Sequence, residues 1–226
     1  MDISKIAIGK NPPHDVNVIV EIPLGGVPVK YEVDKASGAM FVDRFLHTAM
    51  YYPANYGFIP HTLSEDGDPV DVLVLGNVPV VPGSVMRSRP VGVMLMEDEK
   101  GPDEKVLAVP VDDLHPYYNN IASYKDVREV LLHQIEHFFT RYKDLEKGKE
   151  VTLGDWGGPD VAERLILQSI RRAEDGFELR ADLPAGPCAG APGPGPSCCA
   201  RTPALAPLKS GLAARSGATR GAMISD

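Results

Sequence analysis

The chain has 226 residues, of which 43% are hydrophobic, and it carries a formal net charge of −8 at pH 7. That length and composition allow one large or two small globular domains with a buried core. The negative charge argues against binding of bulk nucleic acid, because neutralising a phosphate backbone requires a basic surface. No run approaches the roughly 20 apolar residues of a membrane span, and the N-terminus lacks a basic region followed by an apolar one. We therefore expect a cytoplasmic protein with no membrane partner.

The C-terminal segment differs in composition from the rest of the chain. Ala, Gly, Pro and Ser dominate it and aromatic residues vanish, so we expect a folded domain over residues 1–178 and a disordered Ala/Gly/Pro-rich tail over residues 179–226. All three cysteines fall in the tail, at Cys188, Cys198 and Cys199. Two adjacent cysteines without a CxxC partner are a weak metal or redox signal. Any metal in the folded domain must be held by oxygen or nitrogen.

Short strands separated by turns are predicted as far as about Pro110. Val and Ile alternate with other residues over Asp15–Pro23, which is the period-2 pattern of a strand with one buried face. A second strand over Val29–Val33 places Lys30, Glu32 and Asp34 on one face. Further strands are predicted over Val70–Gly76, Ser84–Met96 and Lys105–Pro110.

Two amphipathic helices are predicted after the strands. Apolar residues recur at helical spacing over Asp126–Lys143, and Gly148 is placed to end that helix. The second helix begins at Pro159, a suitable first-turn residue, and continues to about Glu174. Strands followed by helices indicate an α+β fold built around a small antiparallel barrel.

An acid-rich turn, Asp66-Gly67-Asp68-Pro69-Val70-Asp71, is the segment most suggestive of chemistry. Carboxylates packed this closely repel one another unless a cation lies among them, and hard oxygen ligands select magnesium, manganese or calcium. A solvated acidic turn explains the same spacing, since Asp and Gly are common turn residues. An EF-hand calcium loop does not fit, because Val70 occupies position 5, Asp71 occupies position 6 and a strand follows.

A second acidic segment surrounds Gly101-Pro102 between two predicted strands. It consists of Glu97-Asp98-Glu99 and Asp103-Glu104-Lys105. Alone it is typical of an exposed hairpin loop. Because the same strand-rich domain holds both acidic segments, they could converge on one set of metal ions.

The segment His133-Gln134-Ile135-Glu136-His137 matches the H-x-x-E-H pattern of one class of zinc peptidase. Both histidines lie far around the helix from Leu131 and Ile135, which belong to the apolar stripe. We interpret them as surface or subunit-contact residues and the motif match as accidental.

The run from Asp66 to Val72 resembles the signature of the soluble family I inorganic pyrophosphatases. The similarity covers about residues 3 to 175, whereas Gly154-Asp155-Trp156-Gly157 departs from the usual pattern and the tail has no recognised counterpart. Further segments resemble the family in the family's order: Glu21-Ile22-Pro23, Lys30-Tyr31-Glu32, Phe41-Val42-Asp43-Arg44, Tyr52-Pro53-Ala54-Asn55-Tyr56-Gly57, Arg89-Pro90-Val91-Gly92, Asp98, Asp103-Glu104-Lys105, His137-Phe138-Phe139 and Tyr142-Lys143-Asp144-Leu145-Glu146.

The resemblance implies an α+β fold with a five-stranded OB-like antiparallel β-barrel and flanking α-helices, assembled in the bacterial branch as a homohexamer. It implies that the domain over residues 1–178 hydrolyses inorganic pyrophosphate to two phosphates by a metal-activated water, with several Mg²⁺ ions, or Mn²⁺ or Zn²⁺ in their place. By motif position the general base is Asp68, and the metal ligands are Asp66, Asp71, Asp98 and Asp103. The phosphates are bound by Lys30, Arg44, Tyr56, Lys105, Tyr142 and Lys143. The residues expected near the metals are Glu21, Glu32 and Tyr52.

The chemistry of the substrate fits this mixture of acids and cations. Pyrophosphate carries several negative charges, so a nucleophile approaches it only after metals and cations have neutralised its oxygens. An OB-type binding module without catalysis is the alternative, but it should interleave basic and aromatic residues rather than basic and acidic ones. An inactive relative is the other alternative, although every expected catalytic position carries a chemically competent residue.

Overall fold

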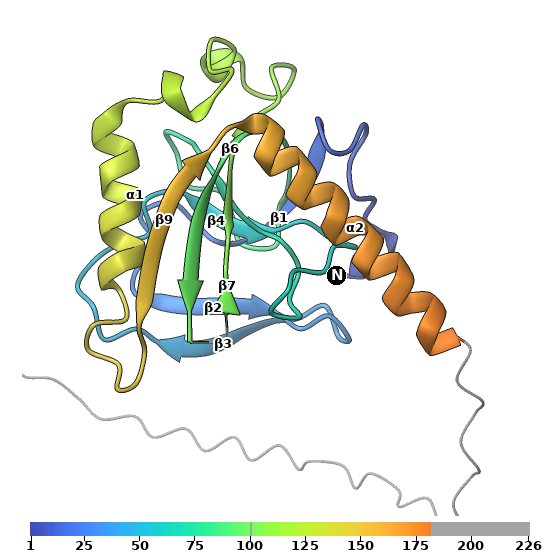
Figure 1. Ribbon diagram of the computed structural model, residues 1–226, viewed down its shortest axis with the longest axis horizontal. Coiled ribbons are helices and arrows are strands. Elements are labelled where there is room, and N and C mark those ends of the chain that lie inside the picture. The colour runs from blue at the N-terminus through green and yellow to red at the C-terminus, as the bar shows by residue number, and fades with distance from the viewer. Residues whose placement is uncertain (100, 182–226) are drawn as a thin grey trace, which may run out of the picture. The chain divides into compact units, whose positions relative to one another are not determined.

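The computed structural model describes residues 1–99 and 101–181, and the expected tail beyond residue 181 lies outside the described residues (Figure 1). The strands are β1 (Val16–Ile22), β2 (Val29–Val33), β3 (Met40–Phe45), β4 (Asn55–Phe58), β5 (Asp71–Val74), β6 (Val85–Asp98), β7 (Gly101–Pro102), β8 (Lys105–Pro110) and β9 (Val151–Gly157). The helices are α1 (Glu129–Arg141) and α2 (Pro159–Ala181), with short 3-10 helices η1 (Ile3–Lys5), η2 (Pro116–Tyr118) and η3 (Tyr124–Asp126).

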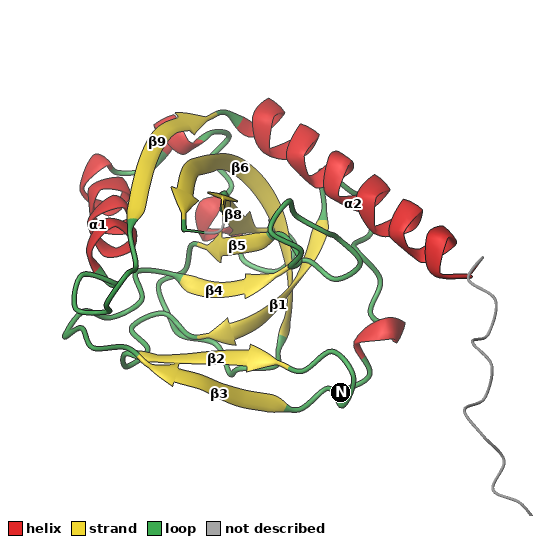
Figure 2. Cartoon of the chain, turned by 60° about the horizontal axis from the view of Figure 1, so that its bottom comes forward, coloured by secondary structure: helices red, strands yellow, loops and turns green. Residues whose placement is uncertain are grey.

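Five strands form a ring in which each strand pairs with two neighbours (Figure 2). The order around the ring is β1, β4, β5, β8, β6 and back to β1. Every pair in the ring is antiparallel except β5 with β8, which is parallel. The expected α+β fold with an OB-like arrangement of five strands is therefore confirmed, with one parallel pair that the antiparallel expectation did not include.

Four strands lie outside the ring. Strands β7 and β9 both pair with β6, and β2 and β3 form a separate two-stranded sheet beside the ring (Figure 2). Strands β3, β4, β7 and β9 were not predicted from the sequence. Strand β4 contains Asn and Gly, and β9 contains Gly and Asp, all of which are depleted in strands, so local propensity does not reveal them. Strand β9 also corrects the expected order of strands first and helices afterwards.

Both faces of β5 are buried, which anchors the end of the acid-rich turn. Val72 and Val74 pack in a cluster that includes Ile166 of α2. Leu73 packs in another cluster that includes Phe139 of α1. Fully burying side chains of this kind stabilises a fold by roughly 1.5–3 kcal/mol each. Asp71, the first residue of β5, is thus attached to one of the most deeply buried strands of the ring.

Strand β1 corrects the expectation of one buried face. Ile19 is fully buried in a third cluster, with Ile3 from the N-terminal segment, Val33 of β2 and Phe58 of β4. Because these segments cover the second face, Glu21 is also buried, with 7% of its surface exposed. This buried carboxyl group lines the cavity of the candidate site.

The two helices flank the strands (Figure 1). Helix α1 packs beside β9, and α2 packs against β6. Helix α2 begins at Pro159, as predicted, but continues past Glu174 to Ala181. Within the described residues, none of the helices combines the length and the apolar character that a membrane crossing requires.

Candidate active site

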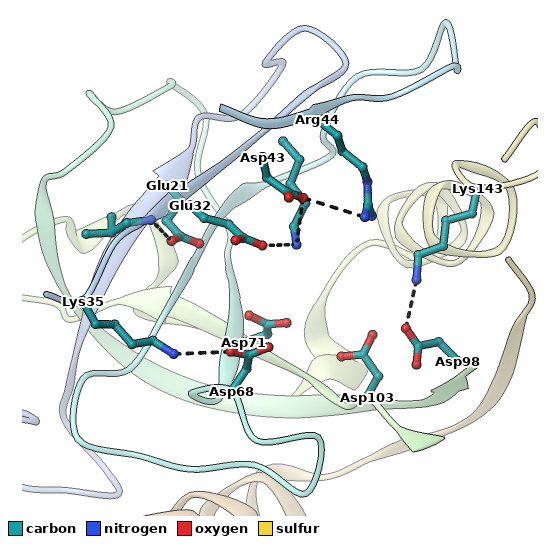
Figure 3. A network of polar contacts seen from close by, with 12 residues as sticks. Glu21, Glu32, Lys35, Asp43, Arg44, Asp68, Asp71, Asp98, Asp103 and Lys143 are labelled. Carbon is teal, nitrogen blue, oxygen red and sulfur yellow. Dashed lines mark hydrogen bonds and ion pairs between the residues drawn. The ribbon is translucent and has the colours of Figure 1, made fainter. Parts of the chain in front are cut away.

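One cavity of about 150 Å³ gathers the predicted site residues (Figure 3). All of them line it except Tyr52. They come from β1, β2, β3, β4, the acid-rich turn, the hairpin around β7 and the end of α1. The two acidic segments therefore face one space, as expected if they converge. The lining consists of Glu21, Lys30, Glu32, Val33, Lys35, Arg44, Tyr56, Phe58, Asp66, Asp68, Pro69, Asp71, Asp98, Glu99, Asp103, Lys105, Tyr142, Lys143 and Lys149.

The acid-rich turn is shaped by its own backbone. Gly67 has a φ of 90°, a conformation that favours glycine over residues with a side chain. The Asp68 amide donates to Asp66 Oδ1 at 3.0 Å, which is the side-chain-to-backbone bond typical of an aspartate in a turn. Asp66 and Asp68 therefore project from a tight turn into the cavity, ahead of the buried strand that begins at Asp71.

A buried lysine links the two acidic segments. The parallel pairing of β5 with β8 puts Asp71 in register with Lys105. Lys105 Nζ lies 2.5 Å from Asp71 Oδ2 and also donates to Asp103 Oδ1, and only 3% of the Lys105 side chain is exposed. Burial by itself would lower the pKa of Lys105, but Asp71 and Asp103 together outweigh it and raise that pKa. Burial also raises the pKa of Asp103, and the positive charge of Lys105 partly offsets this rise.

A second lysine holds the hairpin acids. Lys143, just after α1, has its Nζ 2.9 Å from Asp98 Oδ2 and 3.8 Å from Glu99 Oε2. Both Lys143 and Asp98 are almost wholly shielded, with 6% and 10% of their side chains exposed. This ion pair ties the end of α1 to the hairpin across the cavity (Figure 3).

The β2–β3 sheet supplies two further cations. Lys30 and Arg44 are paired residues on the two strands, so they lie side by side. Lys30 Nζ is 2.5 Å from Glu32 Oε1, and Arg44 Nη1 is 3.7 Å from Asp43 Oδ2. Arg44 Nε also lies 3.7 Å from Glu146, yet this buried nitrogen has no hydrogen-bond partner among the described residues.

Glu21 is the buried acid of the site. Its Oε1 accepts a hydrogen bond from the Val33 amide at 2.7 Å. Burial is the main cause that raises the pKa of Glu21 to about 8; the carboxylates of Asp71 and Glu32 add to it, and the Val33 amide opposes it. A cation bound near Glu21 would stabilise the ionised form of this carboxyl group.

Three buried tyrosines lie behind the charged groups. Tyr56 and Tyr142 line the cavity, and burial, reinforced by Asp71 and Asp103, raises the pKa of each well above its usual value. Both phenols therefore stay protonated and can donate hydrogen bonds at neutral pH. Tyr52 lies one layer behind, with its ring 5.7 Å from that of Tyr56 and 4.7 Å from that of Phe138. It was expected near the metals, but its contacts are those of a side chain that supports Tyr56.

Three charged residues of the lining were not predicted. Lys35 Nζ lies 3.3 Å from Asp68 Oδ1, and Lys149 donates to Glu99. The sequence signal for Glu99 was its place beside Asp98 in the acidic segment. Nothing local distinguishes Lys35 or Lys149 from ordinary surface lysines, because their role depends on contacts between distant segments.

The donor set fits a hard divalent cation. Eight carboxyl groups and six cationic side chains line the cavity, which leaves an excess of two negative charges when every one of them, Glu21 included, is ionised. Every acidic ligand is an oxygen donor of the type that Mg²⁺ prefers. Asp71 and Asp103 already share one positive charge, that of Lys105. No group of three or more His, Cys, Asp or Glu side chains is drawn together tightly enough to ligate an ion over residues 1–99 and 101–181, since lysines occupy several of these carboxylates.

The H-x-x-E-H segment does not contribute to the site. His133 and His137 are both exposed on α1, and His133 lies 3.8 Å from Glu129. Neither histidine lines the cavity. The interpretation of these histidines as surface residues agrees with their positions.

Comparison with known proteins decides the family. The profile described as inorganic pyrophosphatase matches residues 18–174. The chain belongs to the inorganic pyrophosphatase family. Among its relatives in that family, one from Rhodospirillum rubrum is 66% identical over 170 residues, which is 75% of this chain and 95% of the relative. One from Caulobacter vibrioides is 59% identical over 177 residues, which is 78% of this chain and 100% of the relative.

Solved structures of the family agree with the fold. An inorganic pyrophosphatase from Coxiella burnetii superposes with a TM-score of 0.72 at 52% identity, covering 74% of this chain and 99% of that one. The inorganic pyrophosphatase from Thermus thermophilus gives a TM-score of 0.72 at 41% identity, covering 77% and 99%. The similarity therefore extends over the whole length of these pyrophosphatases and leaves the C-terminal part of this chain outside it.

Proposed function

We propose that this chain hydrolyses inorganic pyrophosphate to two phosphates with Mg²⁺ as its cofactor, and that residues 1–178 form the catalytic domain. The observation that carries the proposal is a cavity that gathers both acidic segments together with Lys30, Arg44, Lys105 and Lys143. Acids alone would repel pyrophosphate, and cations alone would not retain a divalent ion. Family membership supports the same reaction.

Four aspartates would hold the magnesium ions: Asp66, Asp71, Asp98 and Asp103. Bound Mg²⁺ neutralises phosphate oxygens and lowers the pKa of water near the scissile bond. Lys105 and Lys143 form ion pairs with Asp71, Asp103 and Asp98. If Mg²⁺ were held by these carboxylates, the two ammonium groups would be available to bind phosphate oxygens.

The remaining cations would fix the phosphates from the opposite side. Arg44 offers a planar fork for two phosphate oxygens, and Lys30 beside it offers a compact positive charge. Tyr56 and Tyr142 would donate neutral hydrogen bonds, since burial keeps them protonated. Together these groups would stabilise the charge that develops on the leaving phosphate.

Asp68 would act as the general base. Its side chain is 61% exposed, so water can reach it directly. It stands between Asp66 and Asp71, on a tight turn that fixes its direction. A carboxylate in this position can orient a water molecule and accept its proton. Tyr52, Glu21 and Glu32 would act on the metals indirectly, through neighbouring groups or water.

The choice of metal and the assembly remain predictions. An all-oxygen donor set supports Mg²⁺, with Mn²⁺ as a substitute, more strongly than Zn²⁺, which often takes nitrogen or sulfur ligands. Family resemblance supports a homohexamer and a cytoplasmic location. The excess of acids over cations in the whole chain supports the expectation that nucleic acid is not a partner.

The test is phosphate release from pyrophosphate by the parent protein and by Asp68→Asn. The substitution removes the proton acceptor and preserves size, so turnover should fall by at least a hundredfold, the low end of general-base contributions. Asp113→Asn, at an exposed aspartate outside the cavity, is the matched control and should retain parental activity. Equal release by parent and Asp68→Asn would refute the assigned role, and binding without release by the parent would favour a binding module.

A further inference from the structure

The acidic loop, defined as residues 63–70, carries Asp66 and Asp68 but has few attachments of its own. At its base, the buried Thr62 hydroxyl donates to Ile59 O at 2.6 Å and accepts from the Val70 amide at 2.9 Å. Within the loop, the Ser64 amide donates to Asp68 O at 2.7 Å. These bonds close the loop on itself, but they do not set its angle to the rest of the fold.

Besides the exposed ion pair of Lys35 with Asp68, helix α2 attaches the base of the loop from outside. Arg172 Nη1 donates to Leu63 O at 2.7 Å, and the Leu63 amide donates to Ser169 O at 3.0 Å. Leu63 is thus held through both of its backbone polar groups by one turn of α2. A pocket of only about 10 Å³ lies here, lined by Ser64 and Val70 of the loop, by Leu165, Ser169 and Arg172 of α2 and by Glu104 and Val106. A space of that size is about one water molecule at most, so helix and loop base are closely packed.

The hydrogen bond from Arg172 to Leu63 O holds the loop more firmly than the ion pair of Arg172 with Glu65 does. Its other contact is to Glu65 at 3.9 Å, and 61% of the Glu65 side chain is exposed. Exposed ion pairs at this distance contribute little. By contrast, a hydrogen bond from a charged group to a partly buried carbonyl is stronger than a neutral one, and it has a defined direction.

We propose that Arg172 is a positioning residue that holds the acidic loop at the angle from which Asp66 and Asp68 face the cavity. Arg172 lines no part of the cavity itself and acts through Leu63. This inference rests on the proposed function for the identity of the ion. Its physical content is separate, namely that a helix packed against the outside of the ring sets the metal affinity of a loop that borders the cavity.

The test compares Arg172→Met, Arg172→Lys and the control Arg171→Met, whose arginine is exposed on the same helix. Manganese binding is measured by electron paramagnetic resonance without substrate, and KM and kcat for pyrophosphate are measured at saturating magnesium. We expect Arg172→Met to weaken manganese binding by roughly ten- to hundredfold, the range to which the loss of one hydrogen bond from a charged donor corresponds. Arg172→Lys, which keeps one donor, should recover part of that loss, and Arg171→Met should match the parent.

Saturating metal separates positioning from general damage. If the loop is only displaced, high magnesium restores kcat in Arg172→Met to within about twofold of the parent, because bound ions draw the loop back. Parental manganese affinity in folded Arg172→Met would overturn the proposal. If the methionine variant does not fold, Arg172→Ala takes its place, and parental manganese affinity in that folded variant would overturn the proposal as well. If the parent binds manganese but releases no phosphate, the proposed function fails and the binding comparison still decides the role of Arg172.

Discussion

Lys105 offers the sharpest test of how the carboxylates of the site are balanced by lysines. Replacing Lys105 with Met keeps the length of the side chain but removes an ammonium group that is 3% exposed and contacts two carboxylates. Asp71 and Asp103 would then face each other without compensation. Removing one partner of a buried ion pair typically costs about 3–5 kcal/mol. Because Asp71 is 25% exposed and water can partly solvate it, we expect the lower end of that range, about 3 kcal/mol.

The assay is urea unfolding of parent and Lys105→Met, first with EDTA and then with magnesium. Magnesium should restore more stability to the variant than to the parent, since the two carboxylates no longer have a lysine competing for them. Lys35→Met is the control. Its lysine is 55% exposed and 3.3 Å from Asp68, so its loss should cost less than about 1 kcal/mol. Equal stability of parent and Lys105→Met in EDTA would refute the reasoning.

Two other predictions follow from Glu21 and from the end of α2. In metal-free protein, Glu21 has the ordinary glutamate pKa of 4.5 in the unfolded chain and a pKa of about 8 in the folded chain. The free energy of unfolding therefore falls as pH rises from 4.5 to about 8, by up to about 4–5 kcal/mol in total. Glu21→Gln should therefore gain stability relative to the parent between about pH 5 and pH 8.5 in urea unfolding with EDTA, and a difference independent of pH would contradict this. Truncation after Ala181 keeps α2 whole and should leave kcat and KM for pyrophosphate within about twofold of the parent; a folded truncation with much lower activity would show that residues 182–226 take part.

Local sequence patterns predicted the elements whose residues have a strong intrinsic preference for the structure that they adopt. The strands over Val29–Val33 and Lys105–Pro110 have the predicted bounds, because β-branched residues and flanking prolines or glycines mark them. Strand β4 was missed because its Asn55 and Gly57 are poor strand formers, held in place by β1 and β5 on either side. Such a segment becomes a strand because of its pairing with distant strands, and local residue patterns in a single sequence do not reveal that pairing.

The same limit applies to the site. The acid-rich turn and the hairpin were recognised as possible partners from their composition, and the family resemblance supplied most of the lining. The place of Lys105 between Asp71 and Asp103 depends on a parallel register between strands that lie far apart in the sequence. The burial of Glu21 depends on the N-terminal segment and β2 covering the second face of β1. Arg172 acts across more than a hundred residues, as its bond to Leu63 shows, and has no local signature.

The most direct test of the central claim is phosphate release from pyrophosphate by the full chain, titrated with magnesium from a state stripped by EDTA. We predict no release above background in EDTA, release that rises and saturates with magnesium, and little or none from p-nitrophenyl phosphate, which lacks the phosphoanhydride bond. Release that is unchanged by EDTA, or no release at saturating magnesium from protein shown to be folded, would contradict the claim.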